Sequence, residues 1–224
     1  MIRFSFLIAF FFLLVSGCGG ESDGNSIHYS ALGASDVVGV GATPLTNGYV
    51  YLIADSIEQQ RGEGVDLTNL GIPGADVGII REVSVEVLKR SEPPDLVTVS
   101  TGANDVIQGD AVASFEEELK LMLDDVRSIA PSSTIAMATI PNLTGVPRFK
   151  DRPDPDVTTS RLQSFNAAIA RQAVSHNALL VDLYSVPLSD SLVSELDGFH
   201  PSDEGHRAIA NQFLAVLTPY IPQL

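Results

Sequence analysis

The feature that most constrains the fold is a regular alternation of short apolar runs with longer helical segments, which begins at residue 27. The apolar runs are rich in Val, Ile, Leu and Thr and carry little charge, as is typical of strands covered on both faces. The five predicted strands are Ile27–Leu32, Val65–Leu70, Leu96–Thr101, Thr134–Ile140 and Ala178–Leu183. Strands that alternate with helices form right-handed crossovers. We therefore expect a three-layer α/β/α fold around a five-stranded parallel sheet.

Each predicted strand is followed by a helical segment, and several of these segments carry residues that favour a helix start. The segments are Asn47–Arg61, Asp76–Arg90, Ser114–Ala130, Thr158–His176 and Ser202–Leu217. Ser114 with Glu117 predicts a capping box, in which each side chain satisfies a backbone N–H group of the first turn. Ser202 precedes Asp203 and Glu204, so we expect it to begin the last helix with favourable charge in the first turn.

The longest segment without a predicted helix or strand is Pro141–Val157, which contains four prolines. It is too polar for a core position, and we expect a surface loop at the edge of the crevice above the sheet. The sequence contains no internal repeat and no second domain boundary. We therefore expect residues 27–224 to form one domain.

The first seventeen residues have the pattern of a signal peptide. Arg3 is followed by the apolar run Phe4–Leu14, which is too short to span a membrane as a helix, since about 20 residues are needed. The run ends in "VSGC", which resembles the lipobox of bacterial lipoproteins, where the chain is cut before the cysteine and the cysteine is lipidated. We expect Cys18 to carry a lipid anchor, followed by a flexible tether over residues 18–26.

The signal-peptide pattern and the "VSGC" sequence together predict a protein that is exported and anchored to a bacterial cell membrane, on its periplasmic or extracellular face. The alternative is an ordinary secretion signal with an incidental cysteine. Cys18 is the only cysteine in the chain, so no internal disulfide can form.

Charge and composition exclude several kinds of partner. The formal net charge is −15, with 28 acidic and 13 basic residues. Such an acidic chain does not bind nucleic acid through its phosphates or anionic lipid by charge. No cluster of His, Cys and Asp has the spacing of metal ligands, so we expect no metal and no other cofactor. The oligomeric state is not predicted.

Four segments are expected to face one crevice. In an open parallel sheet, ligands bind beyond the carboxyl ends of the strands. Three of the segments directly follow the first three predicted strands, and the fourth precedes the last helix. They are Gly33–Asp36, Gly71–Gly74, Gly102–Asp105 and Asp197–Pro201.

Within these segments, one serine has a candidate base. Ser35 needs such a base to act as a nucleophile at neutral pH. His200 lies three residues after Asp197, so one turn could present the imidazole and hold a carboxylate against its other nitrogen. The remaining histidines have structural explanations, at the far end of a strand, at a helix end and inside a helix: His28, His176 and His206.

Donors for an oxyanion are also available. The backbone N–H groups of Ser35 and Gly74 and the side-chain amide of Asn104 are candidates. Taken alone, Gly74 and Asn104 are most often turn residues. Their joint occurrence, each just after a predicted strand, favours the functional interpretation.

At this point the chain resembles the SGNH hydrolases, also called GDSL esterases and lipases. The resemblance rests on four blocks, "LGASDVVGVGA", "NLGIPGADV", "TGANDV" and "DGFHPSDEGH", and extends from about residue 27 to 217. It implies a flavodoxin-like SGNH-hydrolase fold. It also implies that Ser35 is the nucleophile, His200 the base and Asp197 its orienting acid, with Gly74 and Asn104 completing the oxyanion hole.

One departure from the family pattern concerns the nucleophile turn. The family usually has Gly-Asp-Ser, whereas this chain has Gly-Ala-Ser-Asp. Ala34 removes a side chain that could brace the turn. Asp36 either replaces this brace from the other side or is a solvated turn residue.

The expected activity is hydrolysis of acyl esters through an acyl-enzyme intermediate. The charged residues of Pro141–Val157 predict a polar rim, which favours acetyl to roughly hexanoyl esters over long chains. The alternatives are a lysophospholipase or thioesterase of the same family, and a non-catalytic lipoprotein that binds acylated glycans. A flavodoxin-like or nucleotide-binding domain is a further alternative, although the first loop lacks the Walker and G-x-G-x-x-G patterns.

Overall fold

The computed structural model describes residues 26–224. The predicted signal peptide, Cys18 and all but the last residue of the predicted tether lie outside the described residues. Within residues 26–224, no helix has the length and apolar character needed to cross a bilayer.

Five parallel strands form one sheet, as the sequence predicts. They are β1 (Ile27–Gly33), β2 (Val65–Gly71), β3 (Leu96–Ser100), β4 (Thr134–Ala138) and β5 (Leu179–Val181), in the spatial order β2-β1-β3-β4-β5. The last three strands end earlier than predicted. At β4 the reason is a side chain, because the Ile140 N–H donates to Asn166 Oδ1 (2.7 Å) instead of to a neighbouring strand.

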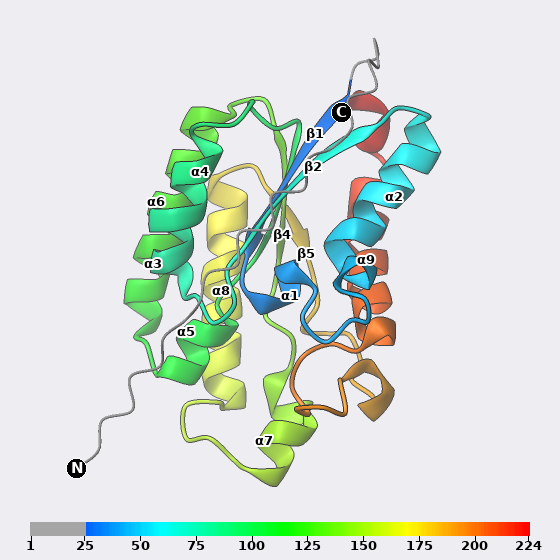
Figure 1. Cartoon of the computed structure of the whole chain (residues 1–224). Helices are drawn as coiled ribbons and strands as arrows, with labels where there is room; N and C mark the ends of the chain where they lie inside the picture. Colours follow the sequence, from blue (N-terminus) through cyan, green and yellow to red (C-terminus); the bar gives the residue numbers. More distant parts are fainter. Residues whose placement is uncertain (1–25) are drawn as a thin grey trace, which may run out of the picture.

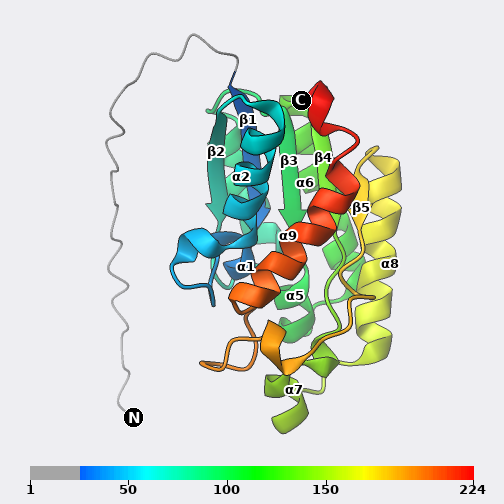
Figure 2. The same ribbon diagram turned by 90° about the vertical axis from the view of Figure 1, so that its right-hand side faces the viewer.

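Helices cover both faces of the sheet, which confirms the three-layer architecture (Figure 1). One face carries α2 (Tyr49–Arg61) and α9 (Asp203–Leu217), which lie side by side in Figure 2. The other face carries α6 (Val112–Ile129), α8 (Thr159–Ser175) and a helix divided into α3 (Val77–Ile79), the π-helical turn η2 (Ile80–Val85) and α4 (Glu86–Leu88).

A separate hydrophobic cluster fills the space on each face of the sheet. On the α6 and α8 side, the rings of Phe115 and Phe165 pack at 4.8 Å. On the α2 and α9 side, the rings of Tyr49 and Phe213 stack at 5.4 Å. Burial of both faces explains why the central strands β3 and β4 are mostly apolar and do not alternate, whereas the edge strand β2 is only partly buried and carries polar residues.

The start of the last helix is confirmed, but the predicted capping box is wrong. Ser202 caps α9, and its hydroxyl accepts a hydrogen bond from the Gly205 N–H (3.1 Å). In contrast, α6 begins at Val112, so Ser114 already lies inside the helix and cannot cap it. The apolar residues Val112 and Phe115 pack against the core, and this packing extends the helix beyond the local capping signal.

Several short elements gather at the carboxyl edge of the sheet. They are α1 (Ser35–Val38), η1 (Leu45–Asn47), α5 (Ala103–Gln108), η3 (Leu143–Gly145), α7 (Pro147–Asp151) and η4 (Asp190–Leu192). A last turn, η5 (Ile221–Gln223), ends the chain.

The segment Pro141–Val157 is therefore not the irregular polar loop that its composition predicts. It contains η3 and α7. Its four large apolar side chains are buried, namely Leu143, Val146, Phe149 and Val157. Its charged residues face solvent because the apolar ones turn inward.

Candidate active site

Ser35 lies at the point where β1 gives way to the single turn α1, and it is half-buried. The chain can turn there because Gly33 lies directly against β3. A Cβ atom on Gly33 would come within 2.1 Å of the Ser100 carbonyl oxygen, so only glycine fits. The sequence predicts this strand-to-turn position for Ser35, and the structure confirms it.

Ser35, His200 and Asp197 form one hydrogen-bonded line. His200 Nε2 lies 2.9 Å from Ser35 Oγ, across 165 residues of sequence. His200 Nδ1 lies 2.5 Å from Asp197 Oδ2. If Nδ1 carries the proton and donates to the carboxylate, Nε2 is free to accept the serine proton.

The Asp197 carboxylate is held by backbone as well as by the imidazole. Its Oδ1 accepts hydrogen bonds from the backbone N–H groups of Phe199 (2.9 Å) and His200 (3.0 Å). Burial acts to raise the pKa of Asp197, but the hydrogen bonds from His200 and Phe199 outweigh it and leave the pKa below its usual value. Asp197 therefore remains ionised when a proton reaches His200.

The turn after α1 packs directly on the segment that carries His200. Gly41 has φ +97°, and a Cβ atom there would lie 2.1 Å from the Pro201 carbonyl oxygen and 3.1 Å from His200 Cβ. Any other residue would force the two segments apart. This close approach brings the first and last motifs of the chain together.

Asn104 and the loop that carries Gly74 are joined to each other. Asn104 Nδ2 donates to the Ala75 carbonyl oxygen (2.8 Å), which leaves the second amide hydrogen available. Asp105 Oδ1 accepts from the Val77 N–H (3.1 Å). The side chains of Asn104 and Asp105 therefore both hold the loop that carries Gly74. Gly74 itself is exposed, with φ +80°. Asn104 lines the cavity beside Ser35, whereas Gly74 belongs to the adjoining loop outside that lining.

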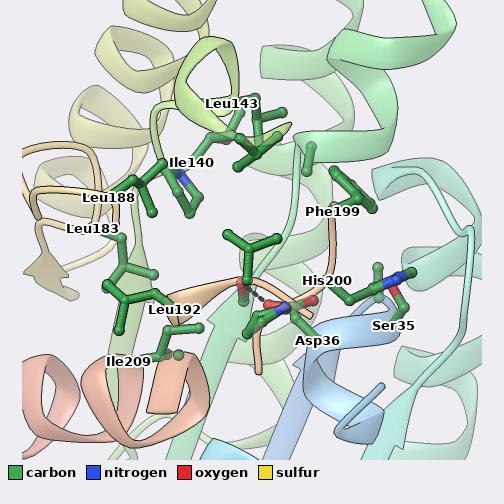
Figure 3. A pocket seen from close by; sticks show the side chains of 18 of the residues that line it. Ser35, Asp36, Ile140, Leu143, Leu183, Leu188, Leu192, Phe199, His200 and Ile209 are labelled. Atoms are coloured by element: carbon green, nitrogen blue, oxygen red, sulfur yellow. Dashed lines mark hydrogen bonds between the residues drawn. The ribbon is translucent and has the colours of Figure 1, made fainter. Parts of the chain in front are cut away.

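A cavity of about 120 Å³ opens beside Ser35 and His200. Figure 3 shows Leu183, Leu188, Leu192 and Ile209 together on the side away from Ser35. The remaining apolar lining includes Ile140, Leu143, Val146, Val186, Val193 and Phe199. Water-filled pockets are lined by polar groups, so this lining instead suits an alkyl group.

Sequence reasoning missed most of this apolar wall. Much of the wall comes from the irregular segment after β5, between residues 183 and 193. A signal existed in "LYSVPLSDSLV", where large apolar residues recur in a stretch with no strand or helix pattern. Large apolar side chains are stabilised by burial away from water, and here those of this segment are shielded by lining one side of the cavity.

The three other histidines have structural contacts. His206 is fully buried; its Nδ1 accepts from the Tyr49 N–H (3.3 Å) and its Nε2 contacts the Val40 carbonyl oxygen (3.1 Å). Burial lowers the pKa of His206, so it stays neutral. His176 directly follows α8, and its Nδ1 lies 2.8 Å from the Gln172 carbonyl oxygen. His28 lies near the amino end of β1, with its Nδ1 3.5 Å from Asp66 Oδ2. Among residues 26–224, no group of three or more His, Cys, Asp and Glu side chains is placed to hold a metal ion.

A parallel α/β domain with this serine, histidine and aspartate beside an apolar cavity belongs to the carboxylic ester hydrolases. The model of the GDSL-like lipase/acylhydrolase family matches residues 31–208. The chain belongs to this family, which confirms the resemblance found in the sequence.

Individual relatives are distant. The chain is 27% identical over 161 residues to a multidomain esterase of Ruminococcus flavefaciens, covering 70% of this chain but only 20% of that protein. It is 22% identical over 208 residues to the spore germination lipase LipC of Bacillus licheniformis, covering 85% of this chain and 96% of LipC.

Solved structures share the fold. The esterase EstA from Pseudoalteromonas sp. superposes with a TM-score of 0.69 at 18% identity, over 87% of this chain and 98% of EstA. A family 3 carbohydrate esterase of Clostridium thermocellum gives a TM-score of 0.70 at 17% identity, over 89% of this chain and 98% of that chain. At these identities the likeness concerns the fold alone.

Proposed function

We propose that the protein cleaves short-chain acyl esters through an acyl-enzyme formed on Ser35. The observation that carries the proposal is the line from Ser35 Oγ through His200 to Asp197 at the mouth of an apolar cavity. A hydroxyl 2.9 Å from an imidazole nitrogen whose other nitrogen meets a carboxylate can lose its proton as it attacks.

The proposed reaction has two steps. Ser35 Oγ attacks the ester carbonyl while its proton passes to His200 Nε2, and the tetrahedral oxyanion forms. His200 then gives this proton to the departing alcohol, which leaves the acyl-enzyme. Water then attacks the acyl-enzyme while His200 takes its proton. The bond between the acyl carbon and Ser35 Oγ breaks, Oγ takes the proton back from His200, and the carboxylic acid is released.

The oxyanion is proposed to lie among three donors: the N–H groups of Ser35 and Gly74 and the free amide hydrogen of Asn104. The hydrogen bond from Asn104 to Ala75 supports this assignment, because it fixes the amide and holds the neighbouring Gly74 loop. Fixed donors need no reorganisation when charge develops, which is why they favour the transition state.

The cavity supports a limit on acyl length of about six carbons. Its volume, about 120 Å³, is slightly below that of an apolar cavity of roughly 150 Å³ that admits benzene. The reason for this limit therefore differs from the one that the sequence predicts. The limit comes from the volume of an apolar cavity and not from a polar rim. An acetyl group would fill the cavity poorly, and an octanoyl group would have to extend out of it.

The test is kcat/KM for p-nitrophenyl esters from acetyl to dodecanoyl. Each methylene that enters the cavity should raise kcat/KM by about fourfold, from ~0.8 kcal/mol per buried CH₂. We expect the rise to stop near hexanoyl. A continued rise past octanoyl, with fatty acid released from lysolipid micelles, would instead support a lysophospholipase.

The role of Ser35 is tested by the same assay. Ser35→Ala should abolish turnover and labelling by a fluorophosphonate probe, whereas Ser56→Ala, half-buried on α2 and outside the cavity lining, should leave both unchanged. A wild-type protein that folds but neither cleaves these esters nor reacts with the probe would support the non-catalytic alternative.

We further propose that Cys18 carries the lipid anchor of an exported protein. The support is the sequence "VSGC" after an apolar run, with no second cysteine. Cys18→Ser should abolish both attachment of lipid and cleavage before residue 18. A Cys18→Ser protein that is still cleaved at that site and still membrane-bound would overturn the proposal.

A further inference from the structure

The departure from the family pattern at Ala34 has a structural counterpart at Asp36. The Asp36 carboxylate is turned inward, and its Oδ2 accepts a hydrogen bond from Ser100 Oγ at 2.6 Å (Figure 3). Asp36 is thus not a solvated turn residue. Both side chains line the cavity beside Ser35.

The helix that carries Ser35 needs outside support. α1 is one turn of four residues, too short to be stable by its own hydrogen bonds. Two contacts hold its carboxyl end: Asn69 Nδ2 donates to the Val37 carbonyl oxygen (2.7 Å), and His206 Nε2 contacts that of Val40 (3.1 Å). At the residue next to Ser35, the Asp36 carboxylate adds a side-chain contact to a different strand.

The partner of Asp36 lies on the strand that delivers Asn104. Ser100 is the last residue of β3, and Asn104 follows it in the first turn of α5. Gly33 pairs with Ser100 in the sheet, so the end of β1 and the end of β3 are joined both by strand pairing and by the side-chain bond from Ser100 to Asp36. The bond between Asp36 and Ser100 therefore connects the nucleophile turn to the segment that carries the oxyanion donor.

The surroundings make this bond strong. Burial raises the pKa of Asp36, and the hydrogen bond from Ser100 counteracts the rise. A hydroxyl donating to a carboxylate is among the shorter and stronger hydrogen bonds in proteins. Its loss would leave a half-buried acceptor without its partner.

From this geometry we infer that Asp36 is a positioning residue, which sets Ser35 at the correct distance from Asn104 by accepting the Ser100 hydroxyl, and so replaces the brace missing at Ala34. The inference rests on the proposed role of Ser35. It adds that catalysis depends on one side-chain pair that does not touch the reacting atoms.

The experiment compares Asp36→Ala, Asp36→Asn, Ser100→Ala and the double variant Asp36→Ala/Ser100→Ala. The readouts are kcat and KM for p-nitrophenyl butyrate and the rate of Ser35 labelling by a fluorophosphonate. We expect either single alanine variant to lower kcat about 10–100-fold, because a displacement near 1 Å costs up to ~10²-fold. KM should change less than threefold, and labelling should slow in parallel with kcat.

The double variant and the asparagine variant separate positioning from general destabilisation. Residues that act through one contact are not additive, so the double variant should be within about threefold of the worse single variant. Asp36→Asn retains an oxygen that can accept from Ser100 and should recover most of the lost kcat. Ser133→Ala is the matched control: it removes a buried hydroxyl that donates to Pro94 O (2.5 Å) at the opposite edge of the sheet, and kcat should be unchanged.

Three results would overturn the inference: wild-type kcat in Ser100→Ala, multiplicative losses in the double variant, or losses that follow the folded fraction measured by thermal unfolding. If Asp36→Ala does not fold, Ser100→Ala and Asp36→Asn still decide the question. Ser35→Ala separates the two proposals, since activity remaining in that variant would reject the nucleophile itself. Loss of activity there, with full activity in the Asp36 and Ser100 variants, would reject only the positioning role.

Discussion

Asp197 holds His200 at two atoms: Oδ2 meets the imidazole Nδ1 at 2.5 Å, and Oδ1 accepts from the His200 backbone N–H at 3.0 Å. This double contact fixes both the ring and the backbone from which it extends. Because the Asp197 carboxylate presents an acceptor to Nδ1, the imidazole keeps its proton on Nδ1. Nε2, the nitrogen that faces Ser35, then carries no proton and can accept one.

Asp197→Asn should therefore lower kcat about 10²–10³-fold with little change in KM. The side-chain amide can donate to Nδ1 and so favour the wrong tautomer. The loss should be smaller than the ~10⁴-fold seen for a buried triad aspartate, because the Asp197 side chain is 39% exposed and solvent can replace part of its effect. Steady-state kinetics check this, and a variant with wild-type kcat would show that His200 needs no orienting acid.

His200 and His206 should respond differently to substitution. His200→Ala should remove nearly all turnover. His206→Ala should keep most of kcat at low temperature but lower the melting temperature, because His206 is fully buried and contacts Tyr49 and Val40. Thermal unfolding and kinetics on both variants provide the check, and equal losses of kcat would mean that the base has been wrongly chosen.

Asn104→Ala should lower kcat about 10²–10³-fold while KM changes little, as expected for one lost oxyanion donor. The substitution also leaves the Ala75 carbonyl oxygen without its partner, so thermal unfolding should be measured alongside. A rise in KM alone would indicate that Asn104 positions the substrate and does not stabilise the transition state.

Filling the cavity should shorten the accepted acyl chain. Leu192 faces the cavity (Figure 3), and Leu192→Phe should reduce kcat/KM for the hexanoyl ester at least tenfold more than for the acetyl ester. Leu180→Phe is the matched control, since Leu180 is exposed on β5 and outside the cavity lining. Equal effects on both esters would place the acyl group elsewhere.

Asp105 should make stability depend on pH. Burial is the main cause that raises the pKa of Asp105 to about 6, with its Oδ2 left unpaired. A carboxyl whose pKa is raised by folding favours the fold while protonated, below about pH 4, and this contribution is lost as pH rises through 6. Relative to Asp105→Asn, the wild type should lose up to about 3 kcal/mol of unfolding free energy between pH 4 and 7.

Denaturant titrations of both proteins at several pH values check this trend. Asp124→Asn is the control with opposite sign, because Lys120 and His176 lower the pKa of Asp124. There the wild type should lose stability, by a small amount, as pH falls towards 3. A flat difference between wild type and Asp105→Asn would show that Asp105 titrates normally.

Much of the fold follows from local patterns that need no tertiary contact. Apolar runs and capping residues predict the parallel strands and the start of α9, because strand and helix periodicity is a property of consecutive residues. The exceptions have tertiary causes. Core packing begins α6 at Val112, ahead of the capping signal at Ser114, and Asn166 takes the hydrogen bond that would have extended β4.

The sequence by itself determined the chemistry of the site. It places Ser35 and Asn104 just after predicted strands and His200 three residues from Asp197, and these are local spacings. Only the tertiary structure decided which distant residues meet. The contact of Asp36 with Ser100 spans 64 residues and depends on the pairing of β1 with β3. The wall of the cavity depends on how the segment after β5 packs. Its recurring apolar residues indicate that the segment is covered, but only the tertiary structure shows that they line the cavity beside Ser35.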